Sequence, residues 1–328
     1  MKSIDLYGLG NGIVDVLVEV SEQEFAKLGY DKGTMALLDE AEQKALLESF
    51  SDRDRKLVSG GSVANSTVLV AQLGAKTAFS CRLSDDNYGL HYKSEFEGLQ
   101  VQLPNPLHVG QTSGTSLILI TPDAERTMRT SLGISGTFGP EEVEEEVVRQ
   151  SRWIFIEGYL FCNPDKGQAA INYAIDLAKR HQTKIAVTLS DAWIVNEFRD
   201  AVEKAVFAAD LVFANEEEAK ALARVGSGHD AFNTLKHRLP GVAVTLGGEG
   251  CFVQYGGHAG HVPAFPIEPA DLTGAGDAFA AGMIYGILTE VEPKHAARGA
   301  NFLAAQVIQK VGARIHGDAK ELWASGLE

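Results

Sequence analysis

Cysteine is scarce in this sequence, and long apolar runs are missing from it. The three cysteines, Cys81, Cys162 and Cys251, are odd in number and far apart, which excludes a disulfide framework and a zinc-binding pattern. No apolar run reaches about 18 residues, which excludes a membrane-spanning helix. The initial MKSIDLYGLG also lacks the features of a signal peptide. We therefore expect a reduced, cytoplasmic protein with no membrane partner.

Positive charge is also in short supply. The 328 residues include 29 lysines and arginines against 44 aspartates and glutamates, which gives a formal net charge of -15. Because nucleic acids and anionic membranes attract basic surfaces, this balance argues against both as partners. A ligand that carries phosphate would therefore need a local site. Hydrophobic residues, at 45%, are abundant enough for a sizeable core.

Short apolar segments alternate with helix-length segments over most of the chain. Four of them are bounded by polar residues or glycine and have the composition of buried strands, at 153–160, 184–190, 210–215 and 241–247. Residues 166–181, between the first two, have the length of a helix. This alternation predicts an α/β fold with a mostly parallel sheet and helices on both faces. A ligand would then bind beyond the carboxyl ends of the strands.

Two early segments, at about 12–37 and 112–132, break this alternation. The second, TSGTSLILITPDAERTMRTSL, is typical of a hairpin with TPDAE as its turn. Neither segment contains an obvious helical crossover, so we expect both to join in a small antiparallel β sheet that projects from the main body as a lid. Because no repeat or linker is visible, we predict a single domain over residues 1–328.

One glycine-rich stretch, DLTGAGDAFAAG, precedes an apolar helix-forming run. A helix start exposes unpaired N–H groups and a partial positive charge, and small residues allow a phosphate to approach them. The amides of Gly274, Ala275 and Gly276 would form such an anion hole. Asp277, in the first turn, would accept a proton from a hydroxyl beside the phosphate. The alternative interpretation is a glycine-rich turn followed by an aspartate that caps the helix.

A second glycine cluster, SGGSVANSTVLVAQLG, also precedes an amphipathic helix. Asn65, on its first turn, could form hydrogen bonds with a polyol. The earlier stretch GLGNGIVD offers Asn11 and Asp15, and Asp15 could accept from two vicinal hydroxyls. This stretch is not a dinucleotide-binding fingerprint, because Ile13 stands at the third glycine position, and the chain lacks a P-loop motif.

GGSVANS and DLTGAGDAFAAG together resemble the two signature regions of the ribokinase-like (PfkB-type) carbohydrate and nucleoside kinases. The resemblance extends over essentially the whole chain, through GNGIVD, NEEEA, TLGGEG and AAQVIQKVGAR. It implies a ribokinase-like fold and phosphoryl transfer from ATP with Mg²⁺. Leu272 departs from the threonine that the family usually has there, but the glycines and Asp277 are in place.

The resemblance also implies residue roles. Asp277 would be the catalytic base, and the amides of Gly274, Ala275 and Gly276 would bind the transferred phosphoryl group. The positions implied for substrate hydroxyls are Asn11, Asp15, Gly60, Gly61 and Asn65. The positions implied for the nucleotide are Asn215, Thr245, Gly247 and Gly250.

Two metal sites follow from the same resemblance. Asn215 and Glu218 match an Asn-x-x-Glu motif linked to Mg²⁺ and its water shell, although the same spacing is a capping box and both roles can coexist. The region around Asp271 and the loop with Val311 and Gly312 resembles a monovalent-cation site held mostly by carbonyls. This adds K⁺ as a further cofactor to be tested.

Two features favour a nucleoside, mainly adenosine, over a free sugar as acceptor. Tyr159 and Phe161 stand at a strand end, where a ring could stack on a base, unless both belong to the core. The lid strands carry apolar residues suited to covering a purine, namely Val16, Met35, Leu37 and Leu117. PDAERTMRTSLG, EGYL, TLSD and VIQKVGAR resemble the bacterial adenosine-kinase-like branch most closely. A sugar kinase of the same family is the alternative.

Arg126 follows the hairpin turn in DAERTMRT. A lid-borne cation there would reach the phosphates once acceptor binding closes the lid, and would stabilise the charge that develops during transfer. Adenosine kinases carry an arginine at the matching place. Arg129 is the nearby rival, and a solvated charge is the alternative.

Two other classes of function are kept for comparison. A non-catalytic nucleoside or sugar sensor on this fold would have no use for Asp277 and an intact anion hole. An NAD-dependent oxidoreductase would need the glycine fingerprint that is missing near the N-terminus. The sequence leaves the oligomeric state, monomer or homodimer, open.

Overall fold

Two separate β-sheets make up the computed structural model, which describes residues 2–123 and 125–328. The strands of the larger sheet are β1 (Ile4–Leu9), β5 (Thr77–Ser80), β6 (Val101–Gln102), β9 (Ser151–Ile156), β10 (Lys184–Thr188), β11 (Leu211–Asn215), β12 (Val242–Thr245), β13 (Cys251–Tyr255) and β14 (His258–Val262). They lie in the order β14-β13-β12-β11-β10-β9-β1-β5-β6. All pairs from β6 to β12 are parallel, and β13 and β14 add an antiparallel edge. The predicted mostly parallel sheet is confirmed.

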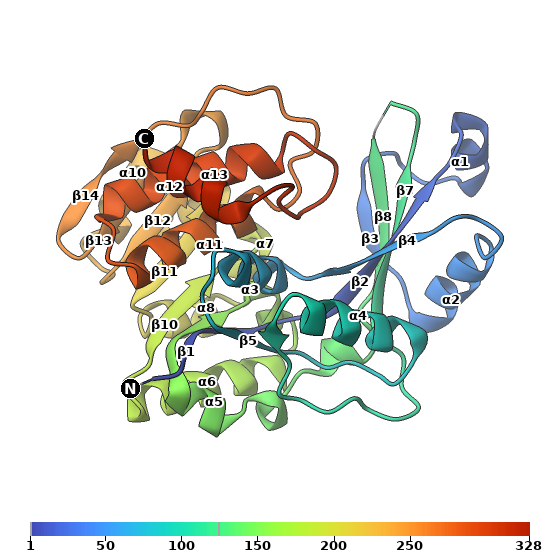
Figure 1. The fold of residues 1–328 in the computed structure, drawn as a ribbon, viewed down its shortest axis with the longest axis horizontal. Coiled ribbons are helices and arrows are strands. Elements are labelled where there is room, and N and C mark those ends of the chain that lie inside the picture. Colours follow the sequence, from blue (N-terminus) through green and yellow to red (C-terminus); the bar gives the residue numbers. More distant parts are fainter. Residues whose placement is uncertain (1, 124) are drawn as a thin grey trace.

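Helices cover both faces of this sheet (Figure 1). They are α3 (Ser62–Gln72), α4 (Asn87–Gly98), α5 (Glu145–Gln150), α6 (Gly167–Arg180), α7 (Ala192–Glu197), α8 (Arg199–Val206), α9 (Glu216–Ala223), α10 (Gly228–Leu235), α11 (Ala275–Leu288), α12 (Pro293–Val307) and α13 (Ala319–Leu327). Alternate residues of β9 enter two different buried clusters, because strand side chains point to opposite faces. Trp153 and Phe155 pack with α3, α11, α12 and α13, whereas Ile154 and Ile156 pack with α5 to α10.

The strand predicted over 153–160 is shorter in the structure. β9 ends at Ile156, and Gly158–Cys162 form a short 3-10 helix at its carboxyl end. The chain therefore turns at the edge of the sheet where a ligand would lie. In the described residues, every helix is too short or too polar to cross a bilayer.

The smaller sheet forms the predicted lid. Its strands are β2 (Ile13–Glu19), β3 (Met35–Leu37), β4 (Lys56–Gly60), β7 (Gly114–Ile120) and β8 (Arg126–Ser131), in the order β3-β8-β7-β2-β4. The hairpin β7–β8 is confirmed, although Ala124 of its turn lies outside the described residues. β2–β4 is also antiparallel, whereas β2–β7 and β3–β8 are parallel. The interpretation of the chain as one domain stays a prediction.

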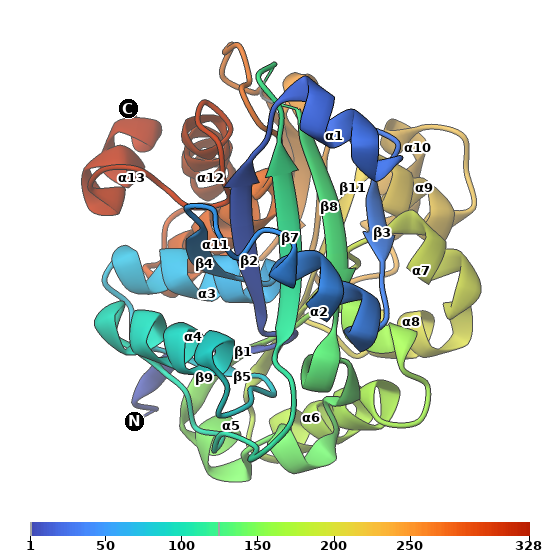
Figure 2. The same cartoon turned by 90° about the vertical axis from the view of Figure 1, so that its right-hand side faces the viewer.

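Two helices of the lid were not expected, namely α1 (Glu22–Leu28) and α2 (Glu40–Glu48). Figure 2 shows them on the outer face of the lid. Each starts with a full capping box, from Ser21 and from Asp39. At 7 and 9 residues they are too short for a clear hydrophobic period in the sequence. The lid is therefore a layered unit whose buried residues continue into the core of the main domain.

This layering corrects one prediction about the acceptor. Val16 and Leu117 are fully buried on the face that packs against α1 and α2, so the prediction that they cover a ligand is wrong. Met35 and Leu37 lie on the opposite face and are 54% and 63% exposed. The two faces differ because side chains alternate along each strand.

Candidate functional site

The start of α11 is open to a ligand. Gly274, its N-cap, has φ 81°, and a β-carbon there would lie 2.7 Å from the α-carbon of Ala313. Only glycine fits this position. A β-carbon at Gly276 would meet no atom within 4 Å. Among the described residues, no backbone acceptor lies opposite the amides of Gly274 or Gly276, whereas the amide of Ala275 has a long 3.3 Å contact to the carbonyl of Leu272.

Asp277 lies where the starts of α3 and α11 meet. Its carboxylate accepts from Ser62 Oγ at 2.6 Å and from Asn65 Nδ2 at 2.9 Å. Both donors come from the first turn of α3, so Asp277 does not act as the cap of its own helix. Burial raises the pKa of Asp277 to about 6, against the effect of these two hydrogen bonds and of the charge of Arg314. The carboxylate is therefore ionised at neutral pH but close to its titration.

The start of α3 is tightly packed instead of open. Gly61, its N-cap, has φ 113°, and a β-carbon there would lie 2.1 Å from the carbonyl oxygen of Asn11. A β-carbon at Gly60 would lie 3.2 Å from Asp15 Oδ2. The two glycines thus bring the backbone against the residues predicted to bind hydroxyls. Burial raises the pKa of Asp15 to about 6, although the charges of Arg126 and Arg314 oppose this rise.

Glu157, at the carboxyl end of β9, is a residue that the sequence reasoning missed. It is 1% exposed and accepts from Asn11 Nδ2 at 2.8 Å, from the Asn11 amide at 3.3 Å and from the Val63 amide at 3.1 Å. Asn11 Oδ1 also accepts from Ser135 Oγ at 3.2 Å. The side chain of Asn11 is therefore held by protein partners, and one amide hydrogen is left for a ligand. Burial raises the pKa of Glu157 to about 7.

Asn215 and Glu218 form the predicted capping box at the start of α9. The Asn215 amide and Nδ2 donate to Glu218 at 2.9 and 2.7 Å, and the Glu218 amide donates back to Asn215 Oδ1 at 2.9 Å. Glu218 is 4% exposed, and burial raises its pKa to about 7. With Ser62, Thr188, Thr245 and Asp277 these two residues line a cavity of about 180 Å³.

The donor set of this cavity fits a hydrated Mg²⁺. Among the described residues, two donors reach the carboxylate of Glu218, and a carboxylate can accept about four hydrogen bonds. Its remaining lone pairs can accept from metal-bound water. In the described residues, no three acidic, histidine or cysteine side chains gather as metal ligands. This suits Mg²⁺, which keeps several waters and binds mainly through substrate phosphates.

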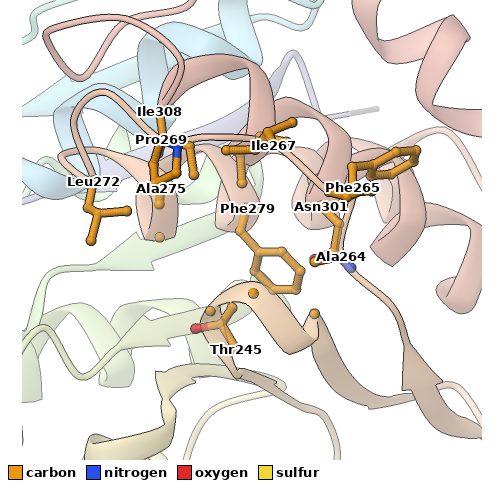
Figure 3. Close-up of a pocket in the computed structure, with 17 residues that line it drawn as sticks. Thr245, Ala264, Phe265, Ile267, Pro269, Leu272, Ala275, Phe279, Asn301 and Ile308 are labelled. Carbon is orange, nitrogen blue, oxygen red and sulfur yellow. The ribbon is translucent and has the colours of Figure 1, made fainter.

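A second cavity, of about 310 Å³, lies beside the start of α11 (Figure 3). Phe265, Ile267 and Phe279 give it apolar walls, and Thr245 and Gly247 lie at the end of β12. Gly250 lines it too, and a β-carbon there would lie 2.1 Å from the carbonyl oxygen of Val262. Thr245, Gly276 and Phe279 line both cavities, so the two spaces meet at the start of α11.

Asp271 does not fit the cation site expected of it. Its carboxylate accepts from the Thr273 amide and hydroxyl, from the Gly312 amide at 2.8 Å and from Arg126. These four donors use all of its acceptor capacity. Burial acts to raise the pKa of Asp271, but these hydrogen bonds and the charge of Arg126 outweigh it and lower the pKa. The carboxylate of Asp271 therefore has no lone pair left for a monovalent cation, and a cation site held by backbone carbonyls stays a prediction.

Arg126 reaches this position from the lid. Its side chain is 7% exposed, so the interpretation as a solvated charge is wrong. Arg129 points to the other face of the lid, where its guanidinium stacks 4.1 Å from the ring centroid of Tyr30 and donates to Thr34. Alternation along β8 separates the two arginines. Of this pair, only Arg126 lies beside the start of α11.

The two aromatic candidates after β9, Tyr159 and Phe161, also differ in their surroundings. Phe161 is 1% exposed and belongs to the core, as its alternative interpretation allowed. Tyr159 is 37% exposed. Burial raises the pKa of Tyr159, and the charges of Asp191, Glu157, Glu218 and Asp277 raise it further. Tyr159 therefore lies on the side of the sheet that carries the site.

The chain is similar to known kinases over most of its length. Residues 37–319 match the model described as pfkB family carbohydrate kinase. A probable sugar kinase from Rhizobium etli CFN 42 is 30% identical, with a TM-score of 0.88 over 100% of both chains. Adenosine kinase from Sinorhizobium meliloti is 31% identical, with a TM-score of 0.87 over 98% of this chain and 99% of that one. Adenosine kinase of Saccharomyces cerevisiae is 26% identical over 335 residues, 93% of this chain and 94% of the yeast protein.

Proposed function

Because the chain belongs to the pfkB family of carbohydrate kinases, it is a phosphotransferase that acts on a sugar or nucleoside hydroxyl, and we propose that its acceptor is the primary hydroxyl of a nucleoside, most simply adenosine. The observation that carries this proposal is the face that the lid turns towards α11. In the register of the sheet, one row across that face has Asp15, Ser116 and Thr130 at its centre, between Val58 and Leu37 at the two edges. The next row is mostly apolar, with Leu17, Ile118, Met128 and Met35, and ends at Lys56.

These two rows match a ligand that is polar at one end and apolar at the other. A free sugar carries hydroxyls all round and would leave the exposed side chain of Met35 in water. A nucleoside would place its ribose at Asp15 and its base along the apolar row, with the exposed ring of Tyr159 available for stacking. The 31% identity to an adenosine kinase over almost the whole chain supports the same choice.

Asp277 is the group suited to activate the hydroxyl. It would accept the hydroxyl proton while the acceptor oxygen attacks the γ-phosphorus of ATP. The bond from that phosphorus to the β–γ bridging oxygen then breaks, and ADP leaves with the oxygen. Ser62 and Asn65 hold the two carboxylate oxygens in place. A pKa of about 6 leaves Asp277 ionised at neutral pH yet basic enough to take the proton.

The two cavities around α11 give ATP its path. Its base would lie in the apolar cavity of Phe265 and Phe279, and its phosphates would cross the amides of Gly274 and Gly276 towards Asp277. The family uses ATP and a divalent metal, and Mg²⁺, when bound, neutralises phosphate charge. The capping box of Asn215 and Glu218 would then hold its water shell.

Arg126 would complete the site from the lid. Its Nη1 already donates to Asp271 and to Thr273, which lead into α11. Its Nε is buried and has no partner among the described residues. A phosphate oxygen at the start of α11 would supply an acceptor, so the guanidinium would add positive charge beside the transferred group. This role depends on the contact that the lid makes with Asp271 and Thr273 through Arg126.

A sugar kinase is the second candidate, because a probable sugar kinase is as similar to the chain as the adenosine kinase is. ADP release with ATP and Mg²⁺ separates the two when adenosine, other nucleosides, ribose and fructose are supplied in turn. We expect the highest kcat/KM with adenosine and AMP as its product by chromatography. Turnover of ribose or fructose without turnover of any nucleoside would contradict the proposal.

A further inference from the structure

Ser190, two residues beyond the carboxyl end of β10, has a strained backbone. Its φ is 65°, and around it the Asp191 amide donates to the carbonyl oxygen of Leu189 at 2.8 Å. A hydrogen bond between residues i and i+2 across a positive φ forms a γ-turn of the rare and strained kind. A residue other than glycine keeps such a conformation mainly at functional sites, where the surrounding structure enforces it.

The end of β9 enforces this turn. A β-carbon at Gly158 would lie 2.4 Å from the carbonyl oxygen of Leu189 and 2.7 Å from that of Thr188, so only glycine allows the two segments to approach this closely. The Gly158 amide also donates to Ser190 Oγ at 3.1 Å. The side chain of Ser190 is therefore held from one side by the residue pair at the end of β9.

Ser190 lines the cavity of about 180 Å³ that also contains Asp277 and Glu218. The charge of Asp191, the next residue, adds to the rise in the pKa of Glu218 that burial causes, so the turn lies close to that carboxylate. A hydroxyl has one hydrogen to donate, and among the described residues the hydroxyl of Ser190 donates it to none. Because the Gly158 amide already occupies one lone pair, this hydrogen is available to a ligand oxygen in the cavity.

Two other donors of this cavity are already engaged. Ser62 Oγ donates to Asp277 at 2.6 Å, and Asn215 Nδ2 donates to Glu218 at 2.7 Å. The two carboxylates make the cavity acidic, so a phosphate that enters it needs donors that are not bound to them. The hydroxyl of Ser190 is such a donor.

We propose that Ser190 is a further catalytic residue, whose hydroxyl donates a hydrogen bond to an oxygen of the γ-phosphoryl group during its transfer. Phosphoryl transfer depends on donors that are held in place before charge develops, and a turn fixed by β9 provides such a support. This inference rests on the proposed path of the phosphates towards Asp277, but it holds for a nucleoside and for a sugar acceptor alike.

Two substitutions separate the hydroxyl from the strain of the turn. Ser190→Ala and Ser190→Gly both remove the hydroxyl, but only glycine relieves the positive φ. We expect kcat to fall by about 10-fold or more in both variants, with the KM values of ATP and of the acceptor changed by less than about twofold. The midpoint of thermal unfolding should nevertheless be about 2 °C higher in Ser190→Gly than in Ser190→Ala. Near-native kcat in either variant would overturn the proposal, because the turn would then matter for the backbone alone.

Gln182, before the other end of β10, is the matched control. It also has a positive φ, 53°, but it is exposed and does not line the cavity. Gln182→Gly should raise the midpoint of thermal unfolding by about 2 °C and leave kcat unchanged. A fall in kcat as large as that in Ser190→Gly would overturn the proposal, because relief of strain beside β10 would then be enough to slow the reaction.

Asp277→Asn distinguishes this proposal from the proposed site itself. ADP release is measured with whichever acceptor the unaltered chain phosphorylates, so the test does not depend on adenosine. Activity that is lost in Asp277→Asn but kept in Ser190→Ala overturns the role of Ser190 alone. Activity that is kept in Asp277→Asn overturns the site on which both proposals rest.

Discussion

The two glycine-led helices, α3 and α11, start alike in the sequence but are built differently. At α11 a β-carbon on Gly276 would meet nothing within 4 Å, and the amides of Gly274 and Gly276 have no backbone acceptor among the described residues. At α3 a β-carbon on Gly61 would lie 2.1 Å from a carbonyl oxygen. The side chains of Ser62 and Asn65 reach from this turn to Asp277.

This difference shows that small residues before a helix can have two different structural roles. At α11 they leave room for an anion at unpaired amides. At α3 they let two backbone segments touch, so that the first turn can hold the carboxylate of the other helix. We therefore propose that the start of α11 binds the phosphoryl group and that the first turn of α3 orients the catalytic base, Asp277.

Among the substitutions that affect the start of α11, we expect the loss of the positive charge of Arg126 to lower kcat most. We expect Arg126→Ala to lower kcat by about 100-fold, with the dissociation constant of the acceptor nearly unchanged, in steady-state assays and calorimetry. Arg129→Ala is the control, because Arg129 faces Tyr30 on the other side of the lid. If Arg126→Ala changes only the dissociation constant of the acceptor, Arg126 does not stabilise the phosphoryl group at the start of α11.

Alanine substitutions at the two helix starts should distinguish the role of α3 from the role of α11. Gly61→Ala should lower the free energy of unfolding by about 2–4 kcal/mol, because of its positive φ and the contact with Asn11. Gly276→Ala should leave stability unchanged or slightly higher but slow phosphoryl transfer by about 10-fold. Denaturant titration and single-turnover assays measure the two effects. Similar destabilisation by both substitutions would remove the distinction.

Glu218 should affect the metal requirement by a smaller factor. We expect Glu218→Gln to raise the Mg²⁺ concentration for half-maximal rate by about 3- to 10-fold, because the amide is a weaker acceptor for metal-bound water. Glu217→Gln, on the exposed side of the same helix, is the matched control. An unchanged Mg²⁺ titration would leave Glu218 as a cap of α9 alone.

The smallest effect should come from monovalent cations. Because Arg126 and three other donors occupy the carboxylate of Asp271, replacing K⁺ by a bulky organic cation at constant ionic strength should change kcat by less than about twofold. Activation by K⁺ well above that would show that the loop of Gly312 rearranges to admit a cation.

Much of the fold could be predicted from local pattern. The lengths of the apolar segments and of the helices between them were enough for the parallel sheet, because each element is long enough to show its period. Helices α1 and α2 were missed because they are short and depend on packing within the lid. The sequence also could not tell which face of the lid is covered, so Val16 and Leu117 were assigned to the wrong one.

The residues of the site also divide into those that the sequence could propose and those that it could not. Asp277, Asp15 and the glycines could be proposed from the sequence because their own segments carry the signal. Glu157 was missed because its role depends on Asn11 and Val63, which are distant in the sequence. An acidic residue at the carboxyl end of a buried strand is the signal that could have found it. The saturation of Asp271 likewise depends on Arg126, which is 145 positions away in the sequence.

The most direct test of the account is the pH dependence of single-turnover phosphoryl transfer to adenosine in the unaltered chain and in Asp277→Asn. Burial raises the pKa of Asp277 to about 6, and the base must be unprotonated, so the rate should fall as the pH drops through about 6. The variant should be slower by at least about 100-fold at pH 7.5, without this acid limb and with ATP binding retained. Near-native transfer by Asp277→Asn would contradict the assignment of the base and of the site around it.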